Sequence, residues 1–212
     1  MRGCRRTDQR PCVRAAARAL CLASLLVVGA SIGLGQQPSQ ESPEPPATDR
    51  IVVVFFDVGG TLTYRDRETG KYAWYSDALE SVEALHGLGL KIGLLSNVPR
   101  GWDEAMLARL LAEPEPLTKL FDPVVLAQSP PPPGYPPPKP DPLAYQNALA
   151  QVGVNTPPFR ALYVGEDRAE VRGARLAGMQ ALLLVRRGRP PRDDPQTIRN
   201  LTELVELMKG EE

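Results

Sequence analysis

The feature that most constrains the fold is the apolar run Ile51-Val-Val-Val-Phe-Phe56, which ends directly at Asp57. The run shows no alternation of apolar and polar side chains, so a strand built from it must be buried on both faces. Strands of that kind occur mainly in parallel sheets that carry helices on each side. The run therefore predicts a central strand of an α/β domain.

Strand and helix patterns alternate through the rest of the chain. Further short apolar runs lie at 91–95, 124–127, 161–164 and 181–185. Segments with helical spacing of apolar residues lie between and after them, at 76–88, 102–112, 142–152, 169–177 and 197–209. This order predicts a Rossmann-like three-layer sandwich, in which helices cover both faces of a central, mostly parallel sheet.

The N-terminal part has a different composition. Residues 1–35 hold six arginines and one acidic residue, and the uncharged apolar stretch 19–35 follows the last arginine. This order is typical of a signal peptide or an uncleaved signal anchor. It predicts an exported domain, periplasmic or secreted, or one anchored in a membrane through 19–35, with organelle import as the alternative. Residues 36–50 contain four prolines and few apolar side chains, so we expect a disordered linker before a folded domain at 51–209.

The residue types in that domain narrow its chemistry. All three cysteines lie in the first 21 residues, and His86 is the one histidine of the chain. These counts exclude a disulfide framework, a cysteine nucleophile and a multi-histidine metal site in the domain. The 25 basic and 25 acidic residues balance, which gives no reason to expect a nucleic acid partner. The chemistry must therefore come from carboxylates, hydroxyls, lysine and backbone amides.

Polar residues follow several of the predicted strands. Asp57 comes after the first, Ser96-Asn97 after the second and Glu166-Asp167 after the fourth, while Lys139 lies just before the helix at 142–152. Ligands of open parallel sheets bind beyond the carboxyl ends of the strands. We therefore expect these side chains to meet at one edge of the sheet.

Four segments in this order resemble the motifs of the haloacid dehalogenase superfamily. They are Asp57-Val-Gly-Gly-Thr-Leu-Thr63, Leu94-Leu-Ser-Asn97, Lys139-Pro-Asp-Pro142 and Val164-Gly-Glu-Asp-Arg-Ala-Glu170. The resemblance covers residues 51–209 and implies a phosphatase-like hydrolase that works through an aspartyl-phosphate. The substrate would be a phosphorylated small molecule or macromolecule.

The resemblance also implies roles for individual residues. Asp57 would be the nucleophile, and Lys139 and Ser96 would assist it. The phosphate would contact Ser96, Asn97, Gly59, Gly60, Thr61 and Lys139. A Mg²⁺ ion, which prefers oxygen ligands, would bind Asp57, the Gly59 carbonyl, Glu166 and Asp167. Glu170 stays open between a supporting role in the site and a place in solvent.

Gly59 departs from the phosphatase pattern, which has a second aspartate at this position. General acid–base assistance is typically worth about 10²–10⁴-fold, so activity could be reduced. The enzyme could act on leaving groups that need no proton, or another group (Asp66, Asp103, Glu104 or one on the substrate) could replace the acid. Otherwise hydrolysis is lost and a catalytically impaired phosphate- or protein-binding module remains.

Two other observations bear on the class of protein. Glu166 stands where the superfamily normally has aspartate, which adds a methylene to the predicted metal site. A dehalogenase is a lower-ranked alternative, because those enzymes also lack the second aspartate.

The segments between the motifs are too short for a sizeable cap domain. Residues 63–95 and 98–138 leave room for little beyond the predicted elements, so the site should be open. The proline-rich loop 129–140 holds eight prolines, interrupted at Gly134-Tyr135, and should be a stiff polyproline II segment. It could be a spacer that delivers Lys139, a wall in which Tyr135 borders the site, or a ligand for a polyproline-binding partner.

Overall fold

The computed structural model describes residues 50–111, 117–153, 156–194 and 196–210. The predicted signal segment 1–35, and the predicted linker except for Arg50, lie outside these ranges. None of the helices in the described part of the chain has the length and apolar character needed to cross a membrane.

A parallel sheet forms the centre of the described domain, with strand order β5-β4-β1-β6-β7-β8. Its strands are β1 (Val53–Phe56), β4 (Lys91–Pro99), β5 (Val124–Ser129), β6 (Ala161–Gly165), β7 (Gln180–Leu184) and β8 (Thr197–Ile198). The chain moves from β1 to β4 on one side and later returns to β6 on the other. The order of strands therefore reverses at β1, where ligands of such sheets bind.

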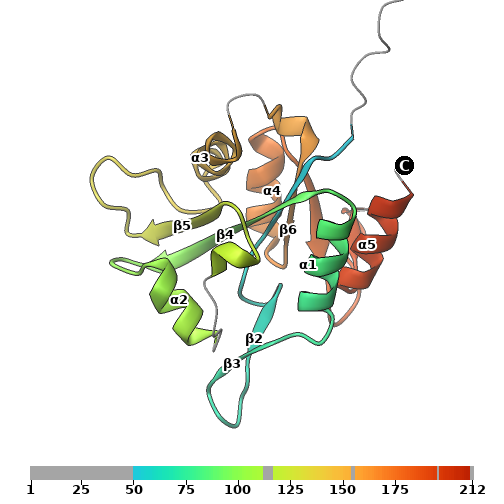
Figure 1. Ribbon diagram of the computed structural model, residues 1–212, viewed down its shortest axis with the longest axis horizontal. Helices are drawn as coiled ribbons and strands as arrows, with labels where there is room; N and C mark the ends of the chain where they lie inside the picture. The colour runs from blue at the N-terminus through green and yellow to red at the C-terminus, as the bar shows by residue number, and fades with distance from the viewer. Residues whose placement is uncertain (1–49, 112–116, 154–155, 195, 211–212) are drawn as a thin grey trace, which may run out of the picture. The chain divides into compact units, whose positions relative to one another are not determined.

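Helices cover both faces of this sheet (Figure 1). Val54 and Phe56 of β1 pack in one core with α1 (Ala78–Gly87), α2 (Glu104–Leu110) and α5 (Leu201–Lys209). Val53 and Phe55 pack in a second core with α3 (Pro142–Val152) and α4 (Arg168–Leu176). Burying one such side chain contributes about 1.5–3 kcal/mol, so the uninterrupted apolar run stabilises both layers. The predicted three-layer α/β sandwich is confirmed.

Short elements complete the domain. β2 (Thr63–Arg65) and β3 (Tyr72–Trp74) pair as an antiparallel hairpin after β1, and two 3₁₀ turns lie at Leu117–Lys119 and Pro158–Arg160. Within the described residues the segments between the motifs form no sizeable cap domain, as predicted.

Several predicted boundaries were wrong; the helix predicted at 102–112, for example, spans Glu104–Leu110. The second strand does not end at Leu95, because β4 continues to pair with β5 as far as Pro99. Thr197 does not begin the last helix, since Thr197–Ile198 pairs with β7 as the edge strand β8. The helix predicted from residue 76 begins at Ala78.

Candidate functional site

Asp57 and Lys139 meet at the carboxyl end of β1. The Lys139 ammonium lies 2.6 Å from Asp57 Oδ1, although the two residues are 82 positions apart in the sequence. The Lys139 side chain has no exposed surface, whereas 13% of the Asp57 side chain is exposed. The carboxylate can thus be reached from solvent while its cationic partner is held beneath it.

Glu170 and Tyr163 complete the surroundings of the Lys139 ammonium. The ammonium lies 2.8 Å from Glu170 Oε2 and donates a hydrogen bond to the Tyr163 hydroxyl at 2.9 Å. Three protons are all that an ammonium can donate, so Asp57, Glu170 and Tyr163 satisfy it. The open question about Glu170 is thereby answered, because its carboxylate lies in this cluster.

Tyr163 links the two ends of the cluster. Its hydroxyl donates to Glu170 Oε2 at 2.7 Å while it accepts from Lys139. Burial, together with the negative charges of Asp57 and Glu170, raises the pKa of Tyr163 well above its ordinary value, so the hydroxyl keeps its proton. This role could not be predicted from the sequence, because a tyrosine inside a buried strand resembles any other core residue.

Asn97 fixes the backbone of the loop that carries Lys139. Its side chain donates to the Lys139 carbonyl oxygen at 2.9 Å and accepts from the Lys139 amide at 2.9 Å. It also donates to Glu170 Oε1 at 3.3 Å. The side chain of Asn97 is therefore engaged with the protein itself, and the expected contact of its backbone amide with phosphate stays a prediction.

The hydroxyls of Ser96 and Thr61 make few or no hydrogen bonds with the described part of the protein. Ser96 is buried, and its hydroxyl makes one long contact, 3.5 Å, with the Asn97 carbonyl oxygen. Thr61 is fully buried, and its hydroxyl has no hydrogen-bond partner within the described structure. A buried hydroxyl without a partner costs roughly 1–3 kcal/mol, and the expected contact of Thr61 with phosphate stays a prediction.

The two glycines after Asp57 differ in their surroundings. Gly60 has φ +73°, and a Cβ there would lie 2.5 Å from Glu166 Cδ, so this position requires glycine. Its amide donates to the Thr63 carbonyl oxygen at 2.7 Å and is thus engaged in the loop, which leaves it unavailable for the predicted phosphate contact. Gly59 is exposed, and a Cβ there would meet no atom within 4 Å.

The acidic pair after β6 divides into two roles. Asp167 Oδ1 caps α4 by accepting from the amides of Ala169 at 2.6 Å and Glu170 at 3.2 Å. Glu166 reaches over Gly60, and its pKa is raised by partial burial and by the nearby carboxylates of Asp57, Asp167 and Glu170. Glu166 is therefore the freer of the two predicted metal ligands.

The donor set at this edge suits a magnesium site with few protein ligands. Among the described residues, no group of three or more His, Cys, Asp or Glu side chains is arranged to hold a metal. Mg²⁺ commonly takes one or two carboxylates and keeps several waters. Asp57 and Glu166, which repel each other, could supply two carboxylates and Gly59 a carbonyl oxygen.

The three residues considered as replacements for the missing acid are engaged elsewhere. Asp66 Oδ1 accepts from two amides and the Thr69 hydroxyl in the β2–β3 turn. Asp103 caps α2, and Glu104 accepts from the amide of Thr118. The hydrogen bonds from Thr69 lower the pKa of Asp66, so an even smaller fraction of this carboxyl group carries a proton at neutral pH.

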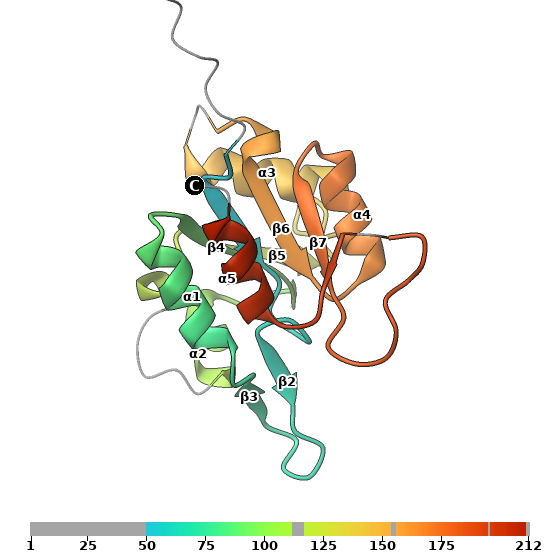
Figure 2. The ribbon, with the colours of Figure 1, turned by 90° about the vertical axis from the view of Figure 1, so that its right-hand side faces the viewer.

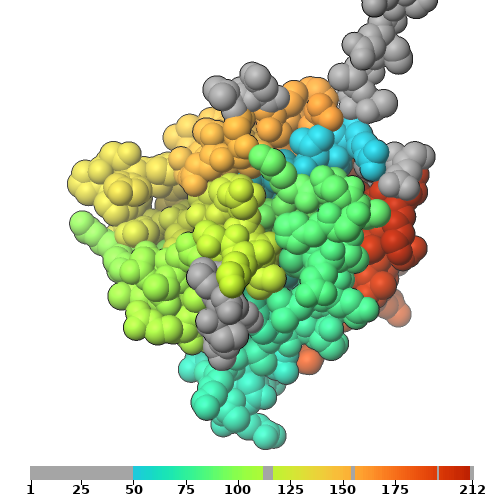
Figure 3. Space-filling model, in the orientation of Figure 1, coloured from blue at the N-terminus to red at the C-terminus, as the bar shows by residue number. Residues whose placement is uncertain are grey.

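The proline-rich loop forms part of the surface next to β5, coloured yellow in Figure 3. A turn at Gly134 interrupts it, where the Tyr135 amide donates to the Pro132 carbonyl oxygen at 3.1 Å. Tyr135 lines a small cavity of about 170 Å³ with residues of β5 and α3. The loop delivers Lys139 to the site, whereas Tyr135 lies beside β5 and α3 instead of bordering Asp57.

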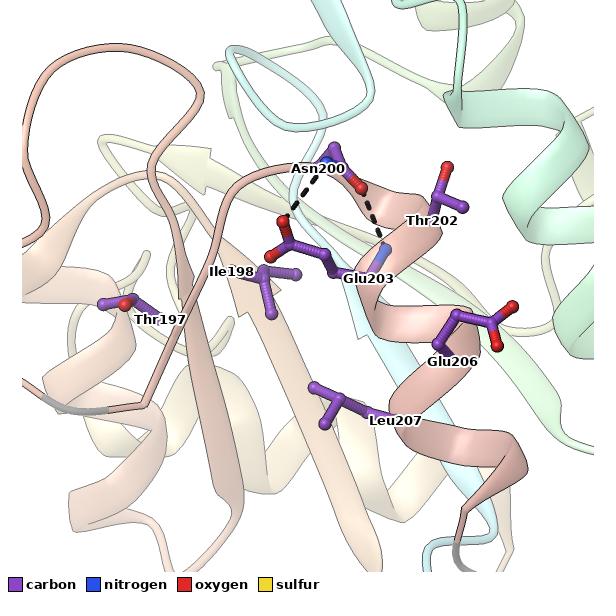
Figure 4. Close-up of a pocket in the computed structure, with 7 residues that line it drawn as sticks. All are labelled: Thr197, Ile198, Asn200, Thr202, Glu203, Glu206 and Leu207. Atoms are coloured by element: carbon purple, nitrogen blue, oxygen red, sulfur yellow. Dashed lines mark hydrogen bonds between the residues drawn. The ribbon is translucent and has the colours of Figure 1, made fainter.

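A separate hollow of about 750 Å³ lies between β8 and α5, at the edge of the sheet. Figure 4 shows that Asn200 and Glu203, which line it, are turned toward each other in the cap of α5. None of the predicted site residues lines this hollow.

His86, which the sequence left without a role, lies on the surface with Nε2 2.9 Å from the Leu120 carbonyl oxygen.

Known structures share this fold at low sequence identity. An uncharacterized protein from Listeria monocytogenes serotype 4b has a TM-score of 0.57 and 23% identity, over 76% of this chain and 99% of that one. The L-2-haloacid dehalogenase of Xanthobacter autotrophicus with chloropropionic acid covalently bound has a TM-score of 0.56 and 17% identity, over 76% of this chain and 99% of that one. A HAD phosphatase from Thermococcus onnurineus has a TM-score of 0.56 and 19% identity, over 76% of this chain and 99% of that one.

The match to a family is independent of these structures. No curated protein matches the chain. The model of the haloacid dehalogenase-like hydrolases matches residues 67–178, which are 112 of the 212 residues. This chain therefore belongs to the haloacid dehalogenase-like hydrolases.

Proposed function

We propose that this protein is a Mg²⁺-dependent phosphatase-like hydrolase in which Asp57 forms an aspartyl-phosphate. The observation that carries the proposal is the contact between the partly exposed Asp57 carboxylate and the fully buried Lys139 ammonium, at 2.6 Å. A buried ion pair is weak evidence for stability, because desolvation offsets much of its attraction. Charges that cluster at the carboxyl end of a strand in a parallel sheet are instead typical of a functional site.

The chemistry follows from which oxygen of Asp57 is engaged. Lys139 holds Oδ1, so Oδ2 is the oxygen that attacks phosphorus. The bond from phosphorus to the leaving oxygen breaks as the bond to Oδ2 forms, and water then hydrolyses the acyl phosphate to restore the carboxylate. Lys139 offsets the negative charge of Asp57 as the phosphate dianion approaches, and the Ser96 hydroxyl can donate to a phosphoryl oxygen.

Mg²⁺ would be held by Asp57, Glu166 and the Gly59 carbonyl, and when bound it would neutralise charge on the phosphoryl oxygens. Asp167 contributes indirectly, because its carboxylate caps the helix that carries Glu170. We assign Glu170 and Tyr163 to positioning, since they fix the Lys139 ammonium without reaching the reacting atoms.

The surroundings of Gly59 favour leaving groups that need no proton. No carboxyl side chain stands at that position, and Asp66, Asp103 and Glu104 are engaged in local structure. The carboxylate and phenolate groups that leave from acyl and aryl phosphates do so without protonation. Acetyl phosphate and p-nitrophenyl phosphate should therefore be better substrates than alkyl phosphates.

The test compares turnover of acetyl phosphate by the native chain and by Asp57→Asn in the presence of Mg²⁺. We expect turnover to disappear in Asp57→Asn and to persist in Asp122→Asn, which removes an exposed carboxylate outside the site. Mass spectrometry of the quenched native reaction should detect phosphate on Asp57. Equal turnover by the native chain and Asp57→Asn would overturn the proposal.

A second candidate is a catalytically impaired phosphate- or protein-binding module on the same fold. The exposed Gly59 and the engaged Gly60 amide favour it, because both remove groups that would assist turnover. Binding of inorganic phosphate without turnover of either test substrate would select this candidate. Release of chloride from chloropropionic acid would instead select the lower-ranked dehalogenase.

We also retain export or membrane anchoring through residues 1–35 as a proposal. Its support is the order of arginines and apolar residues in that segment, which is typical of a signal sequence. Cell fractionation with mass analysis of the N-terminus tests it, and full-length protein in the cytosol would contradict it.

A further inference from the structure

We propose that the site has a second anion-binding subsite, so that the substrate is a small phosphate ester carrying another phosphate or carboxylate group. This inference rests on the proposed function and names a class of substrate for it. The subsite is a cavity of about 360 Å³, lined on one side by Gly60 and Glu166 and on another by the loop between β7 and β8. Gly60 and Glu166 also belong to the candidate site, so the cavity adjoins it.

The walls of this cavity are strongly basic. Arg168, Arg186, Arg187 and Arg189 line it, against the single carboxylate of Glu166. A guanidinium binds phosphate and carboxylate oxygens with two parallel hydrogen bonds. Arginines from one loop and from the start of α4 thus face one space in which an anion can be bound.

Arg186 forms the fixed part of the wall. It donates to the Thr61 carbonyl oxygen at 2.8 Å and to Asp77 Oδ2 at 3.0 Å. Its guanidinium also lies over the ring of Tyr75, 3.7 Å from the centroid. These contacts connect the β7–β8 loop to the residues that follow Asp57, so the position of the basic wall relative to the nucleophile is set by the fold.

Arg187 and Arg189 supply the charge that is not already paired. Both are exposed, and within the described part of the chain neither makes a hydrogen bond or an ion pair. Arg168, by contrast, is paired with Asp193 at 2.7 Å. We therefore assign recognition of the second anionic group to Arg187 and Arg189.

A larger cavity of about 760 Å³ adjoins the first and shares Tyr75 and Arg187 with it. Its other walls come from the β2–β3 hairpin and include Tyr64 and Trp74. Figure 2 shows that the hairpin and the β7–β8 loop extend from the same end of the sheet. These two adjoining cavities offer room for the body of a substrate that extends from the candidate site toward Arg187.

Calorimetry without Mg²⁺ tests the subsite and requires no turnover. Butanediol bisphosphate and butyl phosphate are titrated into the native chain, into Arg187→Ala/Arg189→Ala and into Arg192→Ala/Arg172→Ala. The last variant loses the same charge from exposed arginines that do not line the cavity. Thermal unfolding of each variant establishes that it is folded.

The native chain should bind the bisphosphate about tenfold or more tightly than butyl phosphate, because two guanidinium contacts are added. Arg187→Ala/Arg189→Ala should remove this preference, and the control should keep it. A preference that persists in Arg187→Ala/Arg189→Ala, or is lost equally in the control, would overturn the subsite. The outcome is separate from that for the proposed function, which depends on turnover by Asp57→Asn.

Discussion

The backbone of Pro140 packs directly against Gly173 of α4, where any side chain would collide with the Pro140 carbonyl oxygen. Pro140 follows Lys139, so this contact sets how closely the lysine loop can approach α4. The same helix carries Glu170, one of the partners of the Lys139 ammonium. The absence of a Cβ at position 173 therefore helps to bring Lys139 and Glu170 together.

Gly173→Ala should destabilise the domain and reduce turnover. Alanine in a helix is ordinarily favoured over glycine by about 0.5–1 kcal/mol, but overpacking against backbone costs typically about 1–3 kcal/mol. The cost of the collision should exceed the gain in helix propensity. A displacement of Pro140 would also displace Lys139. Urea unfolding and acetyl phosphate turnover measure the two effects. Gly87→Ala is the matched control, because a Cβ at this position at the end of α1 meets no atom within 4 Å; equal effects of both substitutions would contradict the argument.

Gly59→Asp should raise turnover of alkyl phosphates and change that of acetyl phosphate much less. The backbone of Gly59 is not in the left-handed region and the space beside it is open, so an aspartate can be accommodated without strain. A proton donor there can add about 10²–10⁴-fold for poor leaving groups. Steady-state kinetics on butyl phosphate and acetyl phosphate measure the difference. Gly59→Asn offers the same shape without an acid, and an equal gain in both variants would refute the role of the proton.

Tyr163→Phe should lower stability by about 1–3 kcal/mol, because it leaves Lys139 with one acceptor fewer and Glu170 with one donor fewer in a buried cluster. Turnover should fall together with stability, since the ammonium is then less firmly placed beside Asp57. Tyr145→Phe serves as the comparison. Its hydroxyl donates to the Glu170 backbone carbonyl at 2.6 Å and does not contact Lys139. Urea unfolding and acetyl phosphate kinetics of both variants separate a general loss of buried hydrogen bonds from a specific effect on Lys139.

The sequence was most informative where the determining contacts are local. The helix predicted at 142–152 has those bounds in the structure, because Asp141 caps it by accepting from the Leu143 amide at 2.9 Å and a proline occupies its first position. β1 could be predicted equally well, because each of its side chains is buried and apolar. The pattern did not reveal β8, because two residues are too few to show a period.

The parts of the site that the sequence did not reveal depend on distant contacts. In the sequence Tyr163 resembles an ordinary core residue. Only the fold places Lys139 and Glu170, which belong to other segments, beside its hydroxyl. Asn97 was expected to contact phosphate through its backbone amide, and its sequence position did not reveal that its side chain bonds to the Lys139 backbone, 42 residues away. Such pairings are set by the packing of the sheet against α4, which no single segment encodes.

Asp77 should make stability dependent on acidic pH. Burial favours a higher pKa for Asp77, but the hydrogen bonds from Arg186 and the Leu201 amide outweigh it and lower the pKa. Because the folded-state pKa lies below the unfolded value of about 3.9, the contribution of Asp77 is complete above that value. It is lost as the pH falls through the folded-state pKa.

Asp77→Asn should therefore destabilise the domain at neutral pH and make its stability less sensitive to acid. The amide can still accept from the Leu201 amide but no longer carries the charge that pairs with Arg186. Urea unfolding at a series of pH values from neutral to about pH 3 measures the difference between the two chains. Asp122→Asn, an exposed position, controls for general loss of an acid. The difference should narrow toward acidic pH, because protonation removes the same charge from the native chain; a difference that stays constant would show that packing, and not the ion pair, accounts for the effect of Asp77.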